Sequence, residues 1–170
     1  MKAALLCNGP SRIDYPGRDG YDYVLGCNIP WTSVDATVII DAKVVALWAK
    51  DKNLIKCKAY YSTDAWRHTD EIKQRNFFQS KFLGIFESLK DRDSSGHAAA
   101  RLLIKKGYKD IDVWGADSWF EQTIVSSTHK IIPNLNDDHD RKFVERWREQ
   151  WKVLMDKPDV NIYFRRNSDV

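Results

Sequence analysis

Short apolar runs that end at a polar or turn-forming residue recur along this chain, and they predict β-strands. Each run has the length of a buried strand, and most are followed at once by Asn, Gly, Pro or Asp. We therefore expect six strands, at Ala3–Leu6, Tyr23–Cys27, Ala36–Ile40, Lys58–Tyr61, Asp110–Trp114 and Asn161–Phe164.

Between these runs, apolar residues recur at helical spacing in three segments, Lys43–Lys50, His97–Lys106 and Asp138–Met155. Ser94-Ser95-Gly96 suits the start of the second segment and Gly107 suits its end. Alternation of strands and helices predicts α/β layers around a mostly parallel sheet with helices on both faces. We interpret residues 1–170 as one such domain.

Three stretches give weaker patterns. Residues 12–22 are rich in Gly, Pro and Asp and predict a loop. Asp64–Phe78 has a suitable N-cap and could hold a helix, whereas the aromatic-rich part from Phe77 to Phe86 could be a mobile flap or could pack on the sheet. Gly115–Asp137 shows little periodicity.

Composition narrows the class of protein. The net charge of +3 is too small to indicate nucleic-acid binding by itself. Cys7, Cys27 and Cys57 form no CxxC pair, so a zinc site is not expected, and Cys7 and Cys27 suit small buried apolar positions. We find no secretory or membrane-spanning segment and expect a cytoplasmic protein with reduced thiols.

Polar residues follow four of the predicted strands, where parallel α/β sheets bind their ligands. Asn8, Gly9 and Ser11 follow the first strand and Asn28 the second. Asp41 follows the third strand, and Asp117 follows Asp110–Trp114. Each has a purely structural explanation as a turn or a helix cap. Their occurrence at equivalent strand ends favours a ligand site.

The predicted helix start at Ser95 and Gly96 adds free N–H groups and a partial positive charge, which favour a phosphate or carboxylate. The chain contains neither GxxxxGK[ST] nor GxGxxG, so a Walker-type NTPase and an NAD fingerprint are not expected.

Histidine could supply a general base near neutral pH. His129 lies in a polar Ser-Ser-Thr-His-Lys stretch and is the candidate, although a single histidine is more often structural. His139, beside three aspartates, equally suits a helix cap. No Ser-His-Asp or Cys-His spacing indicates covalent catalysis.

The order of Asn8-Gly9-Pro10-Ser11, Cys27-Asn28, Ser94-Ser95-Gly96 and the segment from Gly107 to Asp117 resembles the bacterial monofunctional sialyltransferases and the related domain of archaeal 6-hydroxymethylpterin pyrophosphokinases. Those families carry "GNGPS", "CN", "TSG" and "GYKEIYLxGxD" in this order. The resemblance implies a Rossmann-like fold and a nucleotide ligand, which in the sialyltransferases is CMP-sialic acid bound without a metal.

By the same resemblance, Asn8, Gly9 and Asn28 would contact the nucleotide, and Ser95 and Gly96 would meet the donor sugar or phosphate. A histidine after the "GxD" segment acts as base in the sialyltransferases, and His129 is the nearest match. The pterin kinases bind a metal at an Asp-rich strand end. Here Asp41 stands without further carboxylates, but Asp41 with Asp117 could hold one Mg²⁺.

The leading hypothesis is a glycosyltransferase-like enzyme that uses a CMP-sugar-like donor and an unknown hydroxyl acceptor. The catalytic candidates are His129 and Asp117, and the nucleotide-binding candidates are Asn8, Gly9, Ser11, Asn28, Asp41, Ser95 and Gly96. No cofactor is required in this interpretation, with Mg²⁺ as an option. The alternative is a non-catalytic module that sequesters a nucleotide or docks on a partner. Nucleic-acid binding would rest only on mild basicity and interspersed aromatic residues.

Overall fold

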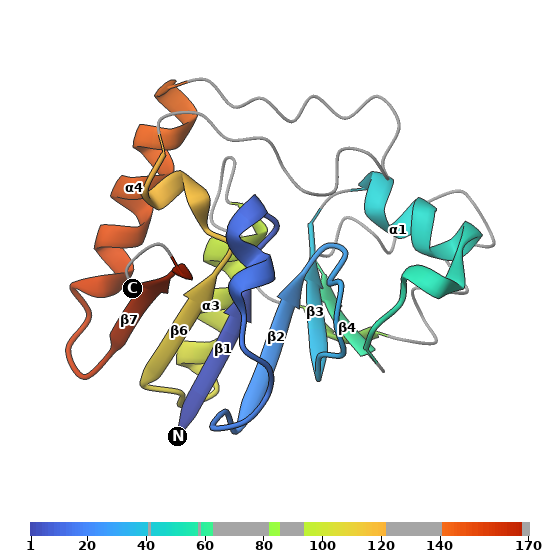
Figure 1. Ribbon diagram of the computed structural model, residues 1–170, viewed down its shortest axis with the longest axis horizontal. Coiled ribbons are helices and arrows are strands. Elements are labelled where there is room, and N and C mark those ends of the chain that lie inside the picture. Colours follow the sequence, from blue (N-terminus) through green and yellow to red (C-terminus); the bar gives the residue numbers. More distant parts are fainter. Residues whose placement is uncertain (41, 58, 63–81, 86–93, 122–140, 168–170) are drawn as a thin grey trace.

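A computed structural model describes the fold over residues 1–40, 42–57, 59–62, 82–85, 94–121 and 141–167 (Figure 1). The strands are β1 Lys2–Leu6, β2 Tyr23–Cys27, β3 Ala36–Ile39, β4 Ala59–Ser62, β5 Phe82–Ile85, β6 Asp110–Trp114 and β7 Asn161–Arg165. The α-helices are α1 Ala42–Lys50, α3 Ser95–Lys105 and α4 Arg141–Met155. Short 3-10 helices are η1 Pro10–Asp14, η2 Lys52–Leu54 and η4 Asp117–Trp119.

The seven strands form one sheet in the order β5-β4-β3-β2-β1-β6-β7. Every neighbouring pair is parallel, so the prediction of a mostly parallel sheet is confirmed. The chain adds β2 to β5 on one side of β1 and then crosses back to add β6 and β7 on the other. The winding direction therefore reverses between β1 and β6, which is where open α/β sheets bind ligands.

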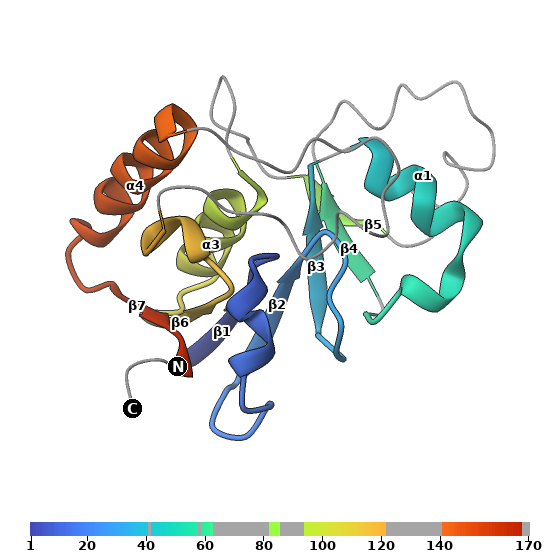
Figure 2. The same cartoon turned by 45° about the horizontal axis from the view of Figure 1, so that its top comes forward.

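Helices cover both faces of the sheet, as predicted. α3 and α4 bury one face through a core that includes Leu5, Leu103 and Trp151. On the opposite face, α1 packs over β3 and β4 around Ile39 and Trp48. Figure 1 shows η1 in front of β1 and α3 behind it, and Figure 2 shows α3 and α4 side by side at the end of the sheet remote from α1.

The differences from the predicted elements are local. Part of the aromatic-rich segment predicted as a flap or a packed stretch is strand β5, a seventh strand in the sheet. The predicted loop over residues 12–22 begins inside η1, because Pro10 at the first position fixes a helical φ. The other strands and the α-helices match the predicted ones to within three residues at each end, whereas η2 and η4 were not predicted. The helix considered for Asp64–Phe78 lies outside the described residues.

Across the described residues, no helix is both long and apolar enough to cross a membrane. All three cysteines, Cys7, Cys27 and Cys57, are free thiols.

Candidate functional site

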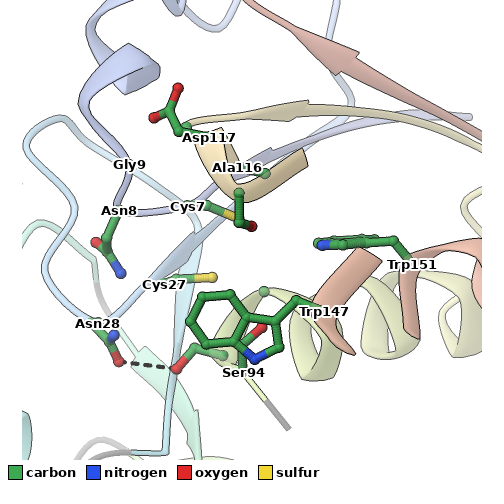
Figure 3. A pocket seen from close by; sticks show the side chains of 14 residues that line it. Cys7, Asn8, Gly9, Cys27, Asn28, Ser94, Ala116, Asp117, Trp147 and Trp151 are labelled. Atoms are coloured by element: carbon green, nitrogen blue, oxygen red, sulfur yellow. Dashed lines mark hydrogen bonds between the residues drawn. The ribbon is translucent and has the colours of Figure 1, made fainter. Parts of the chain in front are cut away.

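A pocket of about 150 Å³ opens at the carboxyl ends of β1, β2 and β6, at the reversal of the sheet (Figure 3). One side, which we call the strand-end wall, consists of the loops after these strands: Cys7, Asn8, Gly9, Cys27, Asn28, Gly115, Ala116, Asp117 and Ser118. The other side, the helical wall, comes from the start of α3 and from α4: Ser94, Ser95, Gly96, Trp147 and Trp151.

The strand-end wall is fixed by main-chain hydrogen bonds that continue beyond β1 and β6. The Cys7 amide donates to the Trp114 carbonyl at 2.8 Å, and the Gly9 amide donates to the Gly115 carbonyl at 2.7 Å. A Cβ atom on Gly9 would lie 2.0 Å from Asp117 Oδ2 and 2.5 Å from the Gly115 oxygen. Only glycine permits this approach, so the packing of this loop against the loop after β6 requires glycine at position 9.

Asp117 holds the loop after β1 in place. Its carboxylate is buried and Oδ2 accepts a hydrogen bond of 2.9 Å from the Ser11 amide, at the start of η1. The first amides of a helix have no partner within the helix, so a carboxylate there is stabilising. Asp117 lines the pocket, and its carboxylate caps η1.

Two asparagine side chains face the pocket from neighbouring loops (Figure 3). Asn28 has a φ of 51°, a left-handed conformation that asparagine tolerates better than most residues. Its Oδ1 accepts a hydrogen bond of 3.1 Å from the Ser95 hydroxyl. Asn8 Oδ1 accepts one of 3.4 Å from Arg12 Nη1. Because the Asn28 oxygen bonds to Ser95, a ligand beside Asn28 would meet its amide nitrogen as a donor.

Arg12 brings a positive charge directly behind Asn8. The residue is buried, its Nη1 donates to the Ile29 carbonyl at 3.0 Å, and its guanidinium lies 4.8 Å from the Trp31 ring centroid. Burial lowers the pKa of Arg12 from its ordinary value. No carboxylate in the described part of the chain forms an ion pair with it. The loops after β1 and β2 are thus tied together by a cation that can also attract an anionic ligand.

The helical wall presents the start of α3. Ser94 is the N-cap, as its sequence position predicts. A Cβ on Gly96 would lie 3.1 Å from Cys7 Sγ and 3.4 Å from Trp151, so glycine lets this turn approach the sheet closely. The first amides of α3, at Ser95 and Gly96, are therefore at the pocket, where an anion can accept their hydrogen bonds.

A buried histidine stands behind this helix start. His97 is 2% exposed; its Nδ1 lies 2.5 Å from Ser94 Oγ, and its Nε2 lies 3.0 Å from the Trp147 carbonyl oxygen. One feature of the sequence indicates the contact between Ser94 and His97, namely the spacing Ser-x-x-His at the predicted start of a helix.

Cys7 and Cys27 give the strand-end wall two thiol groups that face the pocket (Figure 3). The hydrogen bond to Cys7, together with burial, raises the pKa of the Cys27 thiol well above its ordinary value. Cys27 therefore stays a protonated, apolar group, as predicted from its sequence context.

Six of the predicted site residues line the pocket: Asn8, Gly9, Asn28, Ser95, Gly96 and Asp117. Ser11 lies behind the wall and contributes its amide to Asp117. The predicted base His129 and the predicted ligand Asp41 lie outside the described residues. Within the described ranges, no group of three or more His, Cys, Asp or Glu side chains could hold a metal ion.

The aromatic residues of the pocket come from α4, whereas two tryptophans near the strand ends pack within the fold. Trp31 packs beneath Arg12, and Trp119 stacks on Phe164 with ring centroids 4.3 Å apart, so both have structural roles. The pocket is instead lined by Trp147 and Trp151 of α4. Their helical spacing indicated a core-facing stripe and gave no sign that one end of it reaches a pocket.

No known protein family model matches the chain, and no curated protein matches it either. Two solved structures of the sialyltransferase CstII from Campylobacter jejuni share its fold. The complex with cytidine-5'-monophosphate, a substrate analogue, is 15% identical with a TM-score of 0.55, covering 96% of this chain and 78% of that one. The complex with CMP-3FNeuAc is 17% identical with a TM-score of 0.59, covering 96% and 81%. No comparison supports the resemblance to the pyrophosphokinases, and at this identity the likeness to CstII establishes the Rossmann-like α/β fold alone.

Proposed function

We propose that the chain is a glycosyltransferase-like enzyme that binds a nucleotide-activated sugar, resembling a CMP-sugar, in the pocket between the two walls. One observation carries the proposal. Polar groups from the loops after β1, β2 and β6 converge with the start of α3 at the reversal of the sheet, in a fold shared with an enzyme solved in complex with CMP.

The nucleotide phosphate would lie against the first turn of α3. The described residues of the lining include no Lys or Arg, so neutral donors would hold the phosphate: the main-chain amides of Ser95 and Gly96. Arg12, buried behind Asn8, adds a positive potential without contacting the pocket. The side chains of Asn8 and Asn28 would contact the nucleoside.

Metal-independent binding is part of the proposal. Mg²⁺ sites in proteins use one or two carboxylates together with substrate phosphates. Asp117 is the single carboxylate among the described residues of the lining, and its Oδ2 accepts a hydrogen bond from the Ser11 amide. We expect nucleotide affinity to be the same in EDTA and in Mg²⁺. A large gain in affinity with Mg²⁺ would instead support a metal held by Asp117 and Asp41.

A titration of ¹⁵N-labelled protein with CMP, UMP, GMP and AMP tests the binding step. We expect shifts at the amides of Ser95 and Gly96, with a dissociation constant below millimolar for at least one nucleotide. Asn28→Asp keeps the shape and the left-handed conformation but places a carboxylate beside the phosphate, and should weaken binding tenfold or more, about 1.4 kcal/mol. The matched control Asn53→Asp, an exposed position in η2, should bind normally. The absence of binding to all four nucleotides would contradict the proposal.

The size of the pocket favours a second candidate, a non-catalytic nucleotide-binding module. Its volume of about 150 Å³ is below the 300–1,000 Å³ usual for small-molecule sites, which suits part of a nucleotide better than a whole donor. Hydrolysis of a CMP-sugar by the wild type and by His129→Ala distinguishes the candidates. Turnover that His129→Ala lowers by about 100-fold or more supports the transferase with His129 as base. Nucleotide binding with no turnover in either protein supports the module.

A further inference from the structure

The Ser94–His97 pair has the geometry of a hydroxyl activated by a base. Ser94 lines the pocket, and its Oγ lies 2.5 Å from Nδ1 of the buried His97 ring. The other ring nitrogen, Nε2, lies 3.0 Å from the Trp147 carbonyl oxygen. Because a carbonyl can only accept, Nε2 carries the hydrogen, and the lone pair of Nδ1 faces Ser94. The Ser94 hydroxyl is therefore the donor to His97.

The orientation of the imidazole is set by tertiary structure. A nucleophile, a base within hydrogen-bond reach and a third group that orients the base are the parts of an activated hydroxyl. Here the third group is the main-chain carbonyl of Trp147, which comes from α4, 50 residues away in sequence. The Trp151 ring lies 4.5 Å from the imidazole centroid, so a protonated His97 would face an aromatic π-system.

The start of α3 favours negative charge on Ser94. Its Oγ also accepts a hydrogen bond of 3.4 Å from the His97 amide, and it stands at the N-terminus of an 11-residue helix. The partial positive charge there stabilises an alkoxide. A helix cap requires only this acceptor role of Oγ, so the hydrogen bond to the imidazole is an addition to the cap.

The surroundings of Ser94 indicate the substrate class. The indoles of Trp147 and Trp151 and the thiols of Cys7 and Cys27 give the pocket an apolar side, with Trp147 beside Ser94 (Figure 3). Such a side suits a neutral acyl group, and the first amides of α3 could bind an oxyanion.

We propose that Ser94 is a nucleophile, that His97 is its base, and that the pocket hydrolyses esters of small acyl groups. Oγ forms a bond to the ester carbonyl carbon while its proton moves to His97 Nδ1. The carbon–oxygen bond to the alcohol then breaks, and the alcohol leaves with the electron pair and the proton from Nδ1. Water, deprotonated by the same nitrogen, attacks the acyl-serine and releases the carboxylic acid and the Ser94 hydroxyl. This activity does not depend on nucleotide binding.

A fluorophosphonate probe tests the nucleophile, because serine Oγ displaces fluoride from phosphorus and leaves a stable adduct. We expect one adduct per chain by intact mass, mapped to Ser94 by peptide analysis. Ser94→Asn preserves a good N-cap and removes the hydroxyl, and it should give no adduct. Ser33→Ala, an exposed serine outside the pocket, should be labelled like the wild type. No adduct on the wild type, or one at another residue, overturns the proposal.

His97→Asn tests the base, because its side chain can still accept the Ser94 hydrogen bond but cannot take the proton. We expect labelling and p-nitrophenyl acetate hydrolysis by the folded protein to slow by about 100-fold or more. The melting temperature should fall as well, because the hydrogen bond to the Trp147 carbonyl is lost. A folded His97→Asn protein that reacts at the wild-type rate would overturn the pair. If this variant does not fold, the comparison of the wild type with Ser94→Asn still decides the nucleophile.

Discussion

The two walls of the pocket are built by different means. The strand-end wall positions its groups through the main chain: two hydrogen bonds extend the β1–β6 pairing, and Gly9 lies against Asp117 and Gly115. The helical wall positions its groups through large side chains, with Trp151 buried against His97 and Phe164. Backbone contacts can thus fix the pocket-facing groups at the end of a parallel sheet. The helical wall opposite depends instead on the packing of side chains in the core.

Removal of Trp151 should have the largest effect, because it withdraws the packing of the helical wall. The side chain is 2% exposed, and Trp151→Ala should lower the free energy of unfolding by about 4 kcal/mol. Urea denaturation followed by circular dichroism measures this loss. A loss below about 1 kcal/mol would show that α4 does not depend on this side chain.

Gly9→Ala should disrupt the strand-end wall because it adds a methyl group where no space exists. The new methyl group would overlap Asp117 and the Gly115 carbonyl, at a cost of about 3 kcal/mol, and nucleotide binding should be lost with it. Gly20→Ala is the matched control: its φ of 86° strains an alanine, but no atom lies within 4 Å, so we expect about 1 kcal/mol. Equal losses in the two variants would contradict the close packing of Gly9.

Asp112→Asn changes the sheet away from both walls and should leave the pocket intact. Burial raises the pKa of Asp112, but hydrogen bonds from Lys2, Tyr21 and Arg165 more than offset this, and the net pKa is lowered. The ionised carboxylate therefore stabilises the fold at neutral pH, and the variant should lose about 2 kcal/mol there.

The lowered pKa of Asp112 determines how its contribution to stability changes with pH. A depressed carboxyl pKa contributes stability above the unfolded value, about 3.9, and this is lost as the pH falls through the lower folded value. The difference between the wild type and Asp112→Asn should shrink below about pH 4. A constant difference down to pH 2, measured by thermal melting, would exclude this origin.

Ser95→Ala should have the smallest effect and addresses the contact between the walls. The Ser95 hydroxyl donates to Asn28 Oδ1 at 3.1 Å and so connects α3 to the loop after β2. Its loss should cost about 1 kcal/mol or less in stability. Nucleotide affinity should fall about fivefold, because the Asn28 amide loses its fixed orientation. Unchanged affinity in the titration would show that the two walls act independently.

The sequence predicted the strand-end wall better than the helical wall, and the physical reason is local. Turn residues such as Gly9 and Asn28 follow directly from a strand end, so the parallel sheet brings them together without further information. The strands Tyr23–Cys27 and Asp110–Trp114 were predicted with the bounds that the structure has. The prediction that helices cover both faces is also confirmed.

The helical wall could not be predicted in the same way. A helical apolar stripe shows that Trp147 and Trp151 face inward, but the part of the stripe that ends at a pocket depends on how α4 lies against α3. The role of His97 was equally hard to predict, because its hydrogen-bond partner is the main-chain carbonyl of Trp147 on another helix. Strand β5 lay in an aromatic-rich stretch with no clear alternation, so its pairing with β4 was not evident.

The hydrogen bond between Gly9 and Gly115 limits where directed evolution could change the ligand preference of this protein. Backbone atoms hold the strand-end wall in place. Most side-chain substitutions near it therefore either leave its polar groups where they are or clash with neighbouring atoms, as at Gly9. Trp147 is partly exposed and lines the pocket from the helical wall. A library that varies Trp147 while keeping both glycines should therefore yield folded proteins whose ligand preferences differ, and the glycine pair would act as the fixed frame for that search.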